Sequence, residues 1–296
     1  MLTTALTPGL LATFGALAVA MLALWAPRVT AQPLARSWWV WPFAVSLLLA
    51  QGLDLVDTPA LTAMFALVTA CRAGHMAPDG PLKGFALAVM LALSAAILLH
   101  AVPGFNNPKV LDGVRLSADA APYTKFLNFD KGVLGLFLLG LYGPERTWRR
   151  APAGAWRMAA PRFALMTVAV IAATLAAGYA HWDPKLPAWW PLWLGSMVFL
   201  TALPEEAVFR HVVQAGLATW LGPTERARWT ALVAAAALFG LAHIGGGWVD
   251  VGLATLAGLG YGLVYAITGS IAAAIAAHTA LNLLHFLFFT YPALAR

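Results

Sequence analysis

Two things are scarce in this sequence of 296 residues: cysteine and charge. Cys71 is the single cysteine, so the chain can form no intrachain disulfide and offers no metal site built from several thiolates. Only 10% of the residues are charged, while 61% are hydrophobic and the mean hydropathy is +0.77. Ordinary soluble domains do not reach such values. The composition therefore predicts an all-α fold, a polytopic transmembrane helical bundle, in an integral membrane protein.

Acidic residues are also outnumbered by basic ones, which gives a formal net charge of +6. A basic balance can indicate a nucleic-acid partner, but the arginines and lysines here occupy short connections between apolar runs. That placement fits the excess of positive charge in cytoplasmic loops, so we expect a lipid bilayer and no nucleic acid as partner. The most basic connection, which we expect to face the cytoplasm, contains Arg146, Arg149, Arg150, Arg157 and Arg162.

Apolar runs long enough, or nearly long enough, to cross a hydrocarbon core of about 30 Å recur along the whole chain. Because some of these runs are short, we expect about eight to ten spans. The runs lie near residues 9–26, 38–53, 58–71, 85–102, 132–142, 163–180, 189–203, 229–243, 249–267 and 270–290.

The basic connection also marks a predicted division of the chain into two modules. Residues 1–160 would form an amino-terminal transmembrane module of unknown role, and residues 161–296 a carboxy-terminal module that carries the polar motifs. The longest polar connection runs from Pro103 to Lys131, and its charges nearly cancel. Long loops are often functional, so this one is interpreted as a surface cap or lid.

Glu205, Glu206 and Arg210 place formal charges within a segment that otherwise resembles a membrane span. A charge at the centre of a bilayer helix costs about 2.5–3.5 kcal/mol, so this cluster needs a reason. Residues four apart share a helix face, which predicts a pair between Glu206 and Arg210 that can be purely structural. Glu205 has no basic residue at that spacing. It must be protonated, hydrated or paired with a side chain on another helix.

Two later helices supply such side chains. His243 follows Phe239 by four residues and precedes Gly245, so it lies near a predicted helix end. On its own, His243 can equally be a histidine with a structural role. His278 and Asn282 stand four apart on one face, and because hydrocarbon offers them no partner, they predict a shared polar cavity. His285, near the end of the same run, is interpreted as structural support.

Together these side chains meet the requirements of peptide hydrolysis by activated water. The reaction needs a base, a group that orients the base or the water, and hydrogen-bond donors where negative charge develops. Glu205 would be the base and His243 its partner. His278 and the amide of Asn282 would stabilise the tetrahedral intermediate.

The motifs follow one another in a fixed order: Glu205-Glu206-x-x-x-Arg210, Phe239-x-x-x-His243 and His278-x-x-x-Asn282. In this order and spacing they resemble those of the CPBP family, the CAAX proteases and bacteriocin-processing enzymes, also called the Abi family. The resemblance covers roughly residues 163–290 and does not account for the first half of the chain. It implies an intramembrane endopeptidase of the glutamic type.

The resemblance also implies a role for each motif. Glu205 and His243 would activate water, and His278 and Asn282 would form the oxyanion hole. Supporting positions would be Glu206, Arg210 and Phe239. No cofactor is expected. The substrate would be a membrane-associated peptide or protein, lipidated or not, and the alanine-rich, loop-poor composition favours a bacterial inner membrane.

Other functions stay open at this point. A zinc-dependent protease is one, since two histidines and a carboxylate can bind zinc, although the sequence has no His-Glu-x-x-His and the nearby Arg210 disfavours a second positive centre. A transporter is another, but the polar residues are confined to one half and no inverted repeat is visible. The third is a non-catalytic membrane immunity or scaffold protein whose motifs shape a binding cavity.

Overall fold

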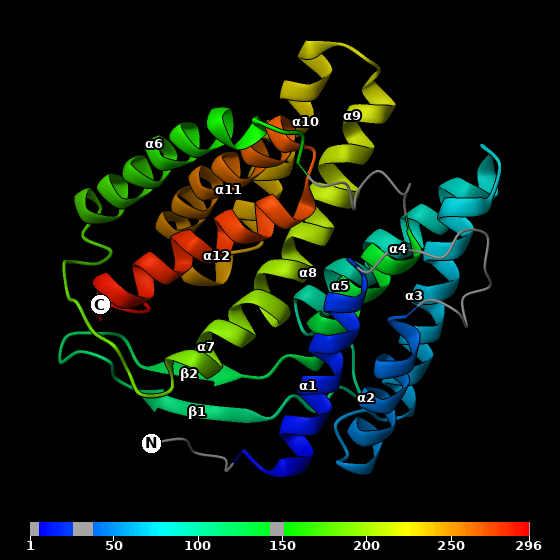
Figure 1. Ribbon diagram of the computed structural model, residues 1–296, viewed down its shortest axis with the longest axis horizontal. Coiled ribbons are helices and arrows are strands. Elements are labelled where there is room, and N and C mark those ends of the chain that lie inside the picture. Colours follow the sequence, from blue (N-terminus) through cyan, green and yellow to red (C-terminus); the bar gives the residue numbers. More distant parts are fainter. Residues whose placement is uncertain (1–5, 26–37, 143–150, 296) are drawn as a thin grey trace. The chain divides into compact units, whose positions relative to one another are not determined.

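The structure is a computed structural model that describes residues 6–25, 38–142 and 151–295 (Figure 1). Helices account for 71% of it, which confirms the predicted all-α bundle. Arg146, Arg149 and Arg150 lie outside the described residues, so the predicted orientation of their connection stays a prediction. The α-helices are α1 (Pro8–Ala23), α2 (Val40–Gly52), α3 (Thr58–Met76), α4 (Pro81–Leu98), α5 (Phe129–Leu141), α6 (Ala155–Ala176), α7 (Trp190–Met197), α8 (Leu203–Glu206), α9 (Ala215–Leu221), α10 (Glu225–Leu241), α11 (Trp248–Thr268) and α12 (Ile271–Phe288).

Five of the described helices are long and apolar enough to cross a membrane. Helices α1 and α2 are apolar but shorter, so the predicted count of eight to ten spans stays a prediction. Helix α6 turns large apolar side chains such as Leu165 and Val168 outward, as a helix that contacts lipid does. The protein is therefore an integral membrane protein. The membrane-spanning candidates are Pro81–Leu98, Ala155–Ala176, Trp190–Leu221, Trp248–Thr268 and Ile271–Phe288.

The long polar connection contains a small sheet that the sequence analysis did not predict. Strands β1 (Lys109–Val114) and β2 (Tyr123–Phe126) pair within it. Val110 and Leu111 are fully buried, so the connection has an apolar anchor of its own despite its many charges. Three polar residues, Arg115, Ser117 and Asp119, alternate with apolar ones between the two strands.

The chain divides into two compact units, and each unit is made of three separate segments of the sequence. The first contains Met1–Leu111, Lys125–Pro144 and Phe199–Pro204, and the second contains Asp112–Thr124, Glu145–Val198 and Glu205–Arg296. Both are therefore built from segments that are distant in the sequence. The predicted division into modules at residue 160 stays a prediction.

Helix α5 is the core of the first unit. It is buried along nearly its whole length and packs against α1, α3 and α4. Gly135 allows α5 to lie close to Leu203 and Pro204, because a Cβ at that position would collide with the Leu203 side chain and with the backbone of Pro204. The buried Asp130, at the start of α5, is held by Nδ1 of His100 at 2.6 Å.

Helix α11 has the corresponding place in the second unit, where it packs against α6, α10 and α12 (Figure 1). It ends at Gly269, whose φ of +61° is the left-handed conformation that favours glycine. Helix α12 begins directly afterwards, with the side chain of Ser270 accepting a hydrogen bond from the backbone of Ala273. This tight connection brings the histidines of α12 alongside α11.

The helix that carries the first motif is not a regular α-helix. Between α7 and α9 it contains two π-helical segments, Val198–Ala202 and Ala207–Gln214, on either side of the short α8. Pro204 lies between them, and a proline inside a helix removes a backbone donor and crowds the preceding turn. π-Helical segments occur frequently at functional sites. The two glutamates of the motif stand at this irregular point.

Candidate active site

The buried ion pair that the spacing predicts is present in the motif helix. Nε of Arg210 donates to Oε2 of Glu206 at 2.9 Å, and both side chains are fully buried. Breaking such a pair by removing one partner leaves an uncompensated charge in a region without water. The pair is therefore a fixed point around which the neighbouring side chains are arranged.

His278 from α12 completes this cluster by lying between the two glutamates. Its Nδ1 is 2.9 Å from Oε1 of Glu206, and its Nε2 is 3.8 Å from Oε2 of Glu205. All three side chains are at most 8% exposed. Glu205 thus faces a side chain from another helix, one of the alternatives that the sequence left open. The expected contact of Glu205 with His243 stays a prediction.

Aromatic rings hold His278 and Arg210 in place. The ring of Tyr261 from α11 stacks on the His278 ring, with centroids 4.5 Å apart and an interplanar angle of 10°. The guanidinium carbon of Arg210 lies 5.4 Å from the Phe239 ring and 6.0 Å from the Tyr261 ring. Such cation–π contacts stabilise a desolvated cation. Phe239 and Tyr261 therefore both contact Arg210, and Tyr261 was not predicted from the sequence. The predicted supporting role of Phe239 stays a prediction.

His243 stands just beyond the end of α10, where the glycine-rich segment interrupts the helix. Its Nδ1 bonds the carbonyl oxygen of Phe239 at 2.8 Å. A carbonyl only accepts, so Nδ1 carries the hydrogen and Nε2 is left with a lone pair. Gly240 allows this placement, because a Cβ there would collide with Thr255 and with the backbone of Val251 on α11.

A cavity of about 250 Å³ connects the second and third motifs. His243, His278 and Asn282 all line it, together with Phe239. The predicted shared cavity is therefore present. Glu205 is not among the residues that line it, although His278, which Glu205 faces, is.

Asn282 and His285 of α12 both line this cavity. Nδ2 of Asn282 is 3.3 Å from the thioether sulfur of Met197, a weak acceptor. The amide of Asn282 therefore keeps most of its capacity to donate to another group. Nε2 of His285 bonds the backbone oxygen of Thr290 at 3.1 Å, which agrees with its interpretation as structural support.

Asp250 and Tyr179 also line the cavity, and the sequence analysis named neither of them. Tyr179 hydrogen-bonds the carboxyl group of Asp250 through its side chain. One signal could have identified Asp250: it is a charged residue inside an apolar run that is long enough to span the membrane. Tyr179 gave no such signal, because tyrosines are ordinary residues near the ends of membrane helices.

A protein metal site usually needs several His, Cys, Asp or Glu side chains close together. Among the described residues, no three such side chains form a group that could hold a metal ion. The expectation that no cofactor is bound stays a prediction.

Comparison with known families was made for the whole chain. A family model described as "Rce1-like: Type II CAAX prenyl endopeptidase Rce1-like" matches residues 187–284. Residues 187–284, called the Rce1-like segment below, are thus similar to this family. This confirms the resemblance that the three motifs predict, and it supports a hydrolase of the CAAX protease type. No curated protein and no solved structure matches the chain.

The Rce1-like segment holds all three motifs but not the whole cavity. Val170, Tyr179, His285 and Tyr291 line the cavity from outside residues 187–284. The walls formed by α6 and by the end of the chain are therefore features of this protein that the family match does not describe.

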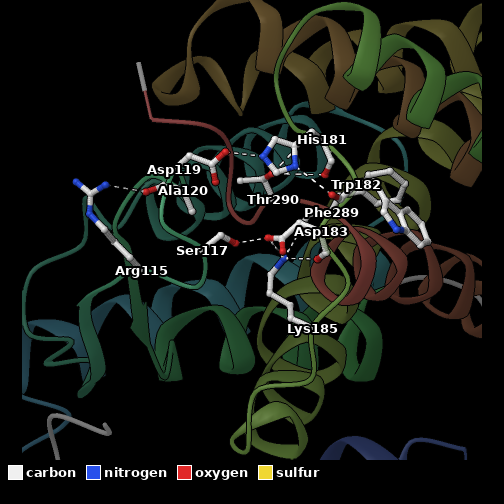
Figure 2. Close-up of polar contacts among 10 residues, drawn as sticks. All are labelled: Arg115, Ser117, Asp119, Ala120, His181, Trp182, Asp183, Lys185, Phe289 and Thr290. Atoms are coloured by element: carbon white, nitrogen blue, oxygen red, sulfur yellow. Dashed lines mark hydrogen bonds and ion pairs between the residues drawn. The ribbon is translucent and has the colours of Figure 1, made fainter.

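A polar cluster joins these outer segments to one another (Figure 2). Ser117 donates to Asp183, and Nζ of Lys185 bonds Asp183 at 2.9 Å as well as the backbone oxygen of Phe289. Asp119 pairs with His181. We call this set the strap cluster: Ser117, Asp119, His181, Asp183 and Lys185. It ties the connection between β1 and β2 to the residues before α7 and after α12.

His181 and Asp119 of the strap cluster shift each other's pKa. The hydrogen bond that His181 donates to Asp119 raises the pKa of His181 above its ordinary value, and the same bond lowers the pKa of Asp119. Phe289 and Tyr291, which line the cavity, follow α12 within the segment that the cluster holds. The interpretation of the 103–131 connection as a cap agrees with these contacts.

Proposed function

We propose that this chain is an intramembrane glutamic endopeptidase of the CAAX type, which hydrolyses a peptide bond in a membrane-associated peptide or protein. The observation that carries this proposal is the position of His278, between Glu205 and Glu206 and on the wall of a cavity that His243 and Asn282 share. The similarity of residues 187–284 to the Rce1-like family supports it.

Glu205 would act as the general base. Its carboxylate lies at the edge of the buried cluster and 3.8 Å from Nε2 of His278, a distance longer than a direct hydrogen bond. A water between Glu205 and the cavity could lose its proton to the carboxylate as it attacks the peptide carbonyl. His243 would orient this water through Nε2, because its Nδ1 is already bound to Phe239.

His278 and Asn282 would stabilise the oxyanion. Asn282 can donate from Nδ2, whose present contact with Met197 is weak. For His278 to donate from Nε2 while Nδ1 donates to Glu206, the ring must carry both hydrogens. The carboxylate of Glu206 is the counter-charge beside that ring, and Arg210 keeps this carboxylate in place. The proton held by Glu205 would then pass to the leaving amine.

The proposed function also includes the membrane in which the protein lies and the kind of substrate that it cleaves. We propose a bacterial inner membrane, with a substrate that reaches the cavity from the bilayer or its surface. The prenylated substrate named in the family description is one candidate, and unmodified membrane-associated peptides are another.

The test is the replacement Glu205→Gln in the purified full-length protein. The amide keeps the shape of the side chain but cannot accept a proton from water, so cleavage of a pool of internally quenched peptides should fall by about 100-fold or more. Glu225→Gln, at an exposed acid at the start of α10, is the matched control and should retain activity. Unchanged turnover in Glu205→Gln would remove the proposed base.

The three alternatives can be tested with the same purified protein and the same variant. A zinc-dependent enzyme would contain stoichiometric metal and lose activity with a chelator, whereas the proposed mechanism predicts full activity after chelation. A non-catalytic scaffold or immunity protein would complement a deletion strain equally well as the Glu205→Gln variant. A transporter would move solute across proteoliposomes regardless of peptide cleavage.

A further inference from the structure

The cavity contains a carboxyl group that none of the three motifs includes. Asp250 is the acidic residue among the described residues that line it, and no lysine or arginine is among them. Acidic side chains in the membrane region are rare and usually have a partner or a function. Asp250 interacts electrostatically with His243, a side chain that can carry a positive charge.

The side chain of Asp250 is held in one position from two sides. It belongs to the first turn of α11, and its carboxyl group lies against the backbone at Gly246, where a Cβ would collide with it. From the other side, Tyr179 hydrogen-bonds the carboxyl group. The carboxyl group also lies at the positive end of the helix dipole. Asp250 is thus presented to the cavity as a fixed carboxyl group whose oxygens can accept hydrogen bonds from a cation.

The remaining cavity wall is largely apolar. Val170 comes from α6, Leu253 from α11 and Leu281 from α12. At about 250 Å³, the cavity is smaller than the roughly 300–1,000 Å³ of a pocket for a drug-sized ligand. It has the dimensions for a side chain or two and not for a large ligand.

We propose that Asp250, held by Tyr179, forms a subsite that selects a lysine or arginine side chain next to the scissile bond of the substrate. The inference rests on the proposed protease function and names the class of peptide it prefers. The long aliphatic stem of lysine or arginine would pack against the apolar wall, with its charged end at the carboxylate. Such charge-assisted hydrogen bonds are about twice as strong as neutral ones.

The subsite borders the reacting groups. His243 and Asp250 line the same cavity, and Asn282 and His278 line it from α12. A side chain bound at Asp250 would therefore place its own backbone near the proposed oxyanion donors. This is the arrangement that a specificity subsite requires, because it fixes the peptide bond relative to the water-activating groups.

The first experiment compares internally quenched peptides in which lysine, norleucine or glutamate occupies each position around the cleavage site. Norleucine keeps the stem of lysine and removes its charge. At one position, the wild-type protein should cleave the lysine peptide at least about tenfold more efficiently in kcat/KM than the norleucine peptide. Equal cleavage of the lysine and norleucine peptides at every position would overturn the inference. This experiment needs only the wild-type protein.

The second experiment changes the subsite itself. Asp250→Asn should remove the preference for lysine, so that the ratio of kcat/KM for the lysine and norleucine peptides falls towards parity, mainly through a higher KM for the lysine peptide. Asp250→Lys should reverse the preference towards glutamate. Tyr179→Phe keeps the ring and removes the hydrogen bond to Asp250, so it should weaken the lysine preference by a smaller factor. This variant still tests the subsite if the Asp250 variants do not fold. A lysine preference that survives in all three variants would contradict the assignment.

Failure of the protease proposal is distinguishable from failure of this inference. In the Glu205→Gln background, binding of fluorescently labelled lysine and norleucine peptides can be measured without turnover. Tighter binding of the lysine peptide that depends on Asp250 supports the subsite even if no cleavage is found. Cleavage by the wild-type protein, with equal binding of both peptides, supports the protease and rejects the subsite.

Discussion

Two ionic clusters of the second unit use the same kinds of side chain in opposite surroundings. Glu206, Arg210 and His278 are at most 3% exposed, whereas the side chains of His181 and Asp119 are 49% and 50% exposed. In the first cluster each charge has lost its water and depends entirely on its partners. In the second, water can reach His181 and Asp119 and replace either of these two partners.

This difference predicts different consequences when a partner is removed. A buried pair is costly to break because the remaining charge cannot be solvated, while an exposed pair contributes little to stability and is screened by salt. The buried cluster therefore fixes the geometry of the candidate active site. The strap cluster is suited to holding a segment that can be released.

The largest effect is expected for Glu206→Ala. Arg210 and His278 would both lose their carboxylate, and the free energy of unfolding should fall by about 3–5 kcal/mol. Unfolding in mixed detergent–SDS micelles measures this. Glu225→Ala, at an exposed acid, is the control and should change stability little. If Glu206→Ala unfolds like the wild type, the cluster does not anchor the site.

A double replacement sharpens this result. Glu206→Leu combined with Arg210→Met removes both charges and should recover part of the stability, since a well-packed apolar pair often equals a buried ion pair. Peptide cleavage should remain lost, because His278 would no longer have its counter-charge. Recovery of both stability and cleavage would show that the ion pair serves only folding.

An intermediate effect, on activity alone, is expected for Asn282→Ala. Loss of one oxyanion donor typically lowers kcat by about 100- to 1,000-fold. Stability should change little, because the amide contacts only the thioether of Met197 among the described residues. Steady-state kinetics and thermal unfolding of the same preparation measure both. Asn128→Ala, at a helix N-cap without a side-chain hydrogen bond, is the control for replacing an asparagine.

The smallest effect is expected in the strap cluster, as a function of pH. Because the pKa of His181 is raised, its contribution is fully present below the ordinary histidine value of 6.5 and is lost as pH rises through the raised value. Because the pKa of Asp119 is lowered, its contribution is present above 3.8 and is lost as pH falls through the lowered value. The pair is therefore strongest in mildly acidic solution.

Hydrogen exchange of residues 112–124 measures this dependence. Exchange, corrected for the intrinsic effect of pH, should increase from pH 6 to pH 9 by less than about fivefold, and high salt should have a similar effect. Asp119→Asn should remove the pH dependence. An unchanged pH profile in Asp119→Asn would show that the pair does not hold the segment.

Some of the candidate site could be predicted from sequence because helix geometry is local. Glu206 and Arg210 are four residues apart, and their pair follows from that spacing even in an irregular helix. The end of α10 before Gly245 follows from the glycines. The partner of Glu205 could not be predicted, because His278 is 73 residues away in the chain and only helix packing brings the two together.

The positions of Asp250 and Tyr179 show the same limit. Their hydrogen bond joins α11 to the segment after α6, and nothing in either local sequence specifies the other. The strap cluster likewise brings Ser117 to Asp183 and Lys185 to Phe289, from segments whose order in the sequence gives no sign of contact.

The sequence by itself determined that the chain is a helical membrane protein, where its helices lie, and which polar residues need an explanation. These properties depend on composition and on short-range periodicity, which each segment carries on its own. Only the tertiary structure decided that His278 lies between two glutamates and that Asp250 faces the same cavity. Contacts between helices depend on how their side chains pack, and a single segment does not contain that information.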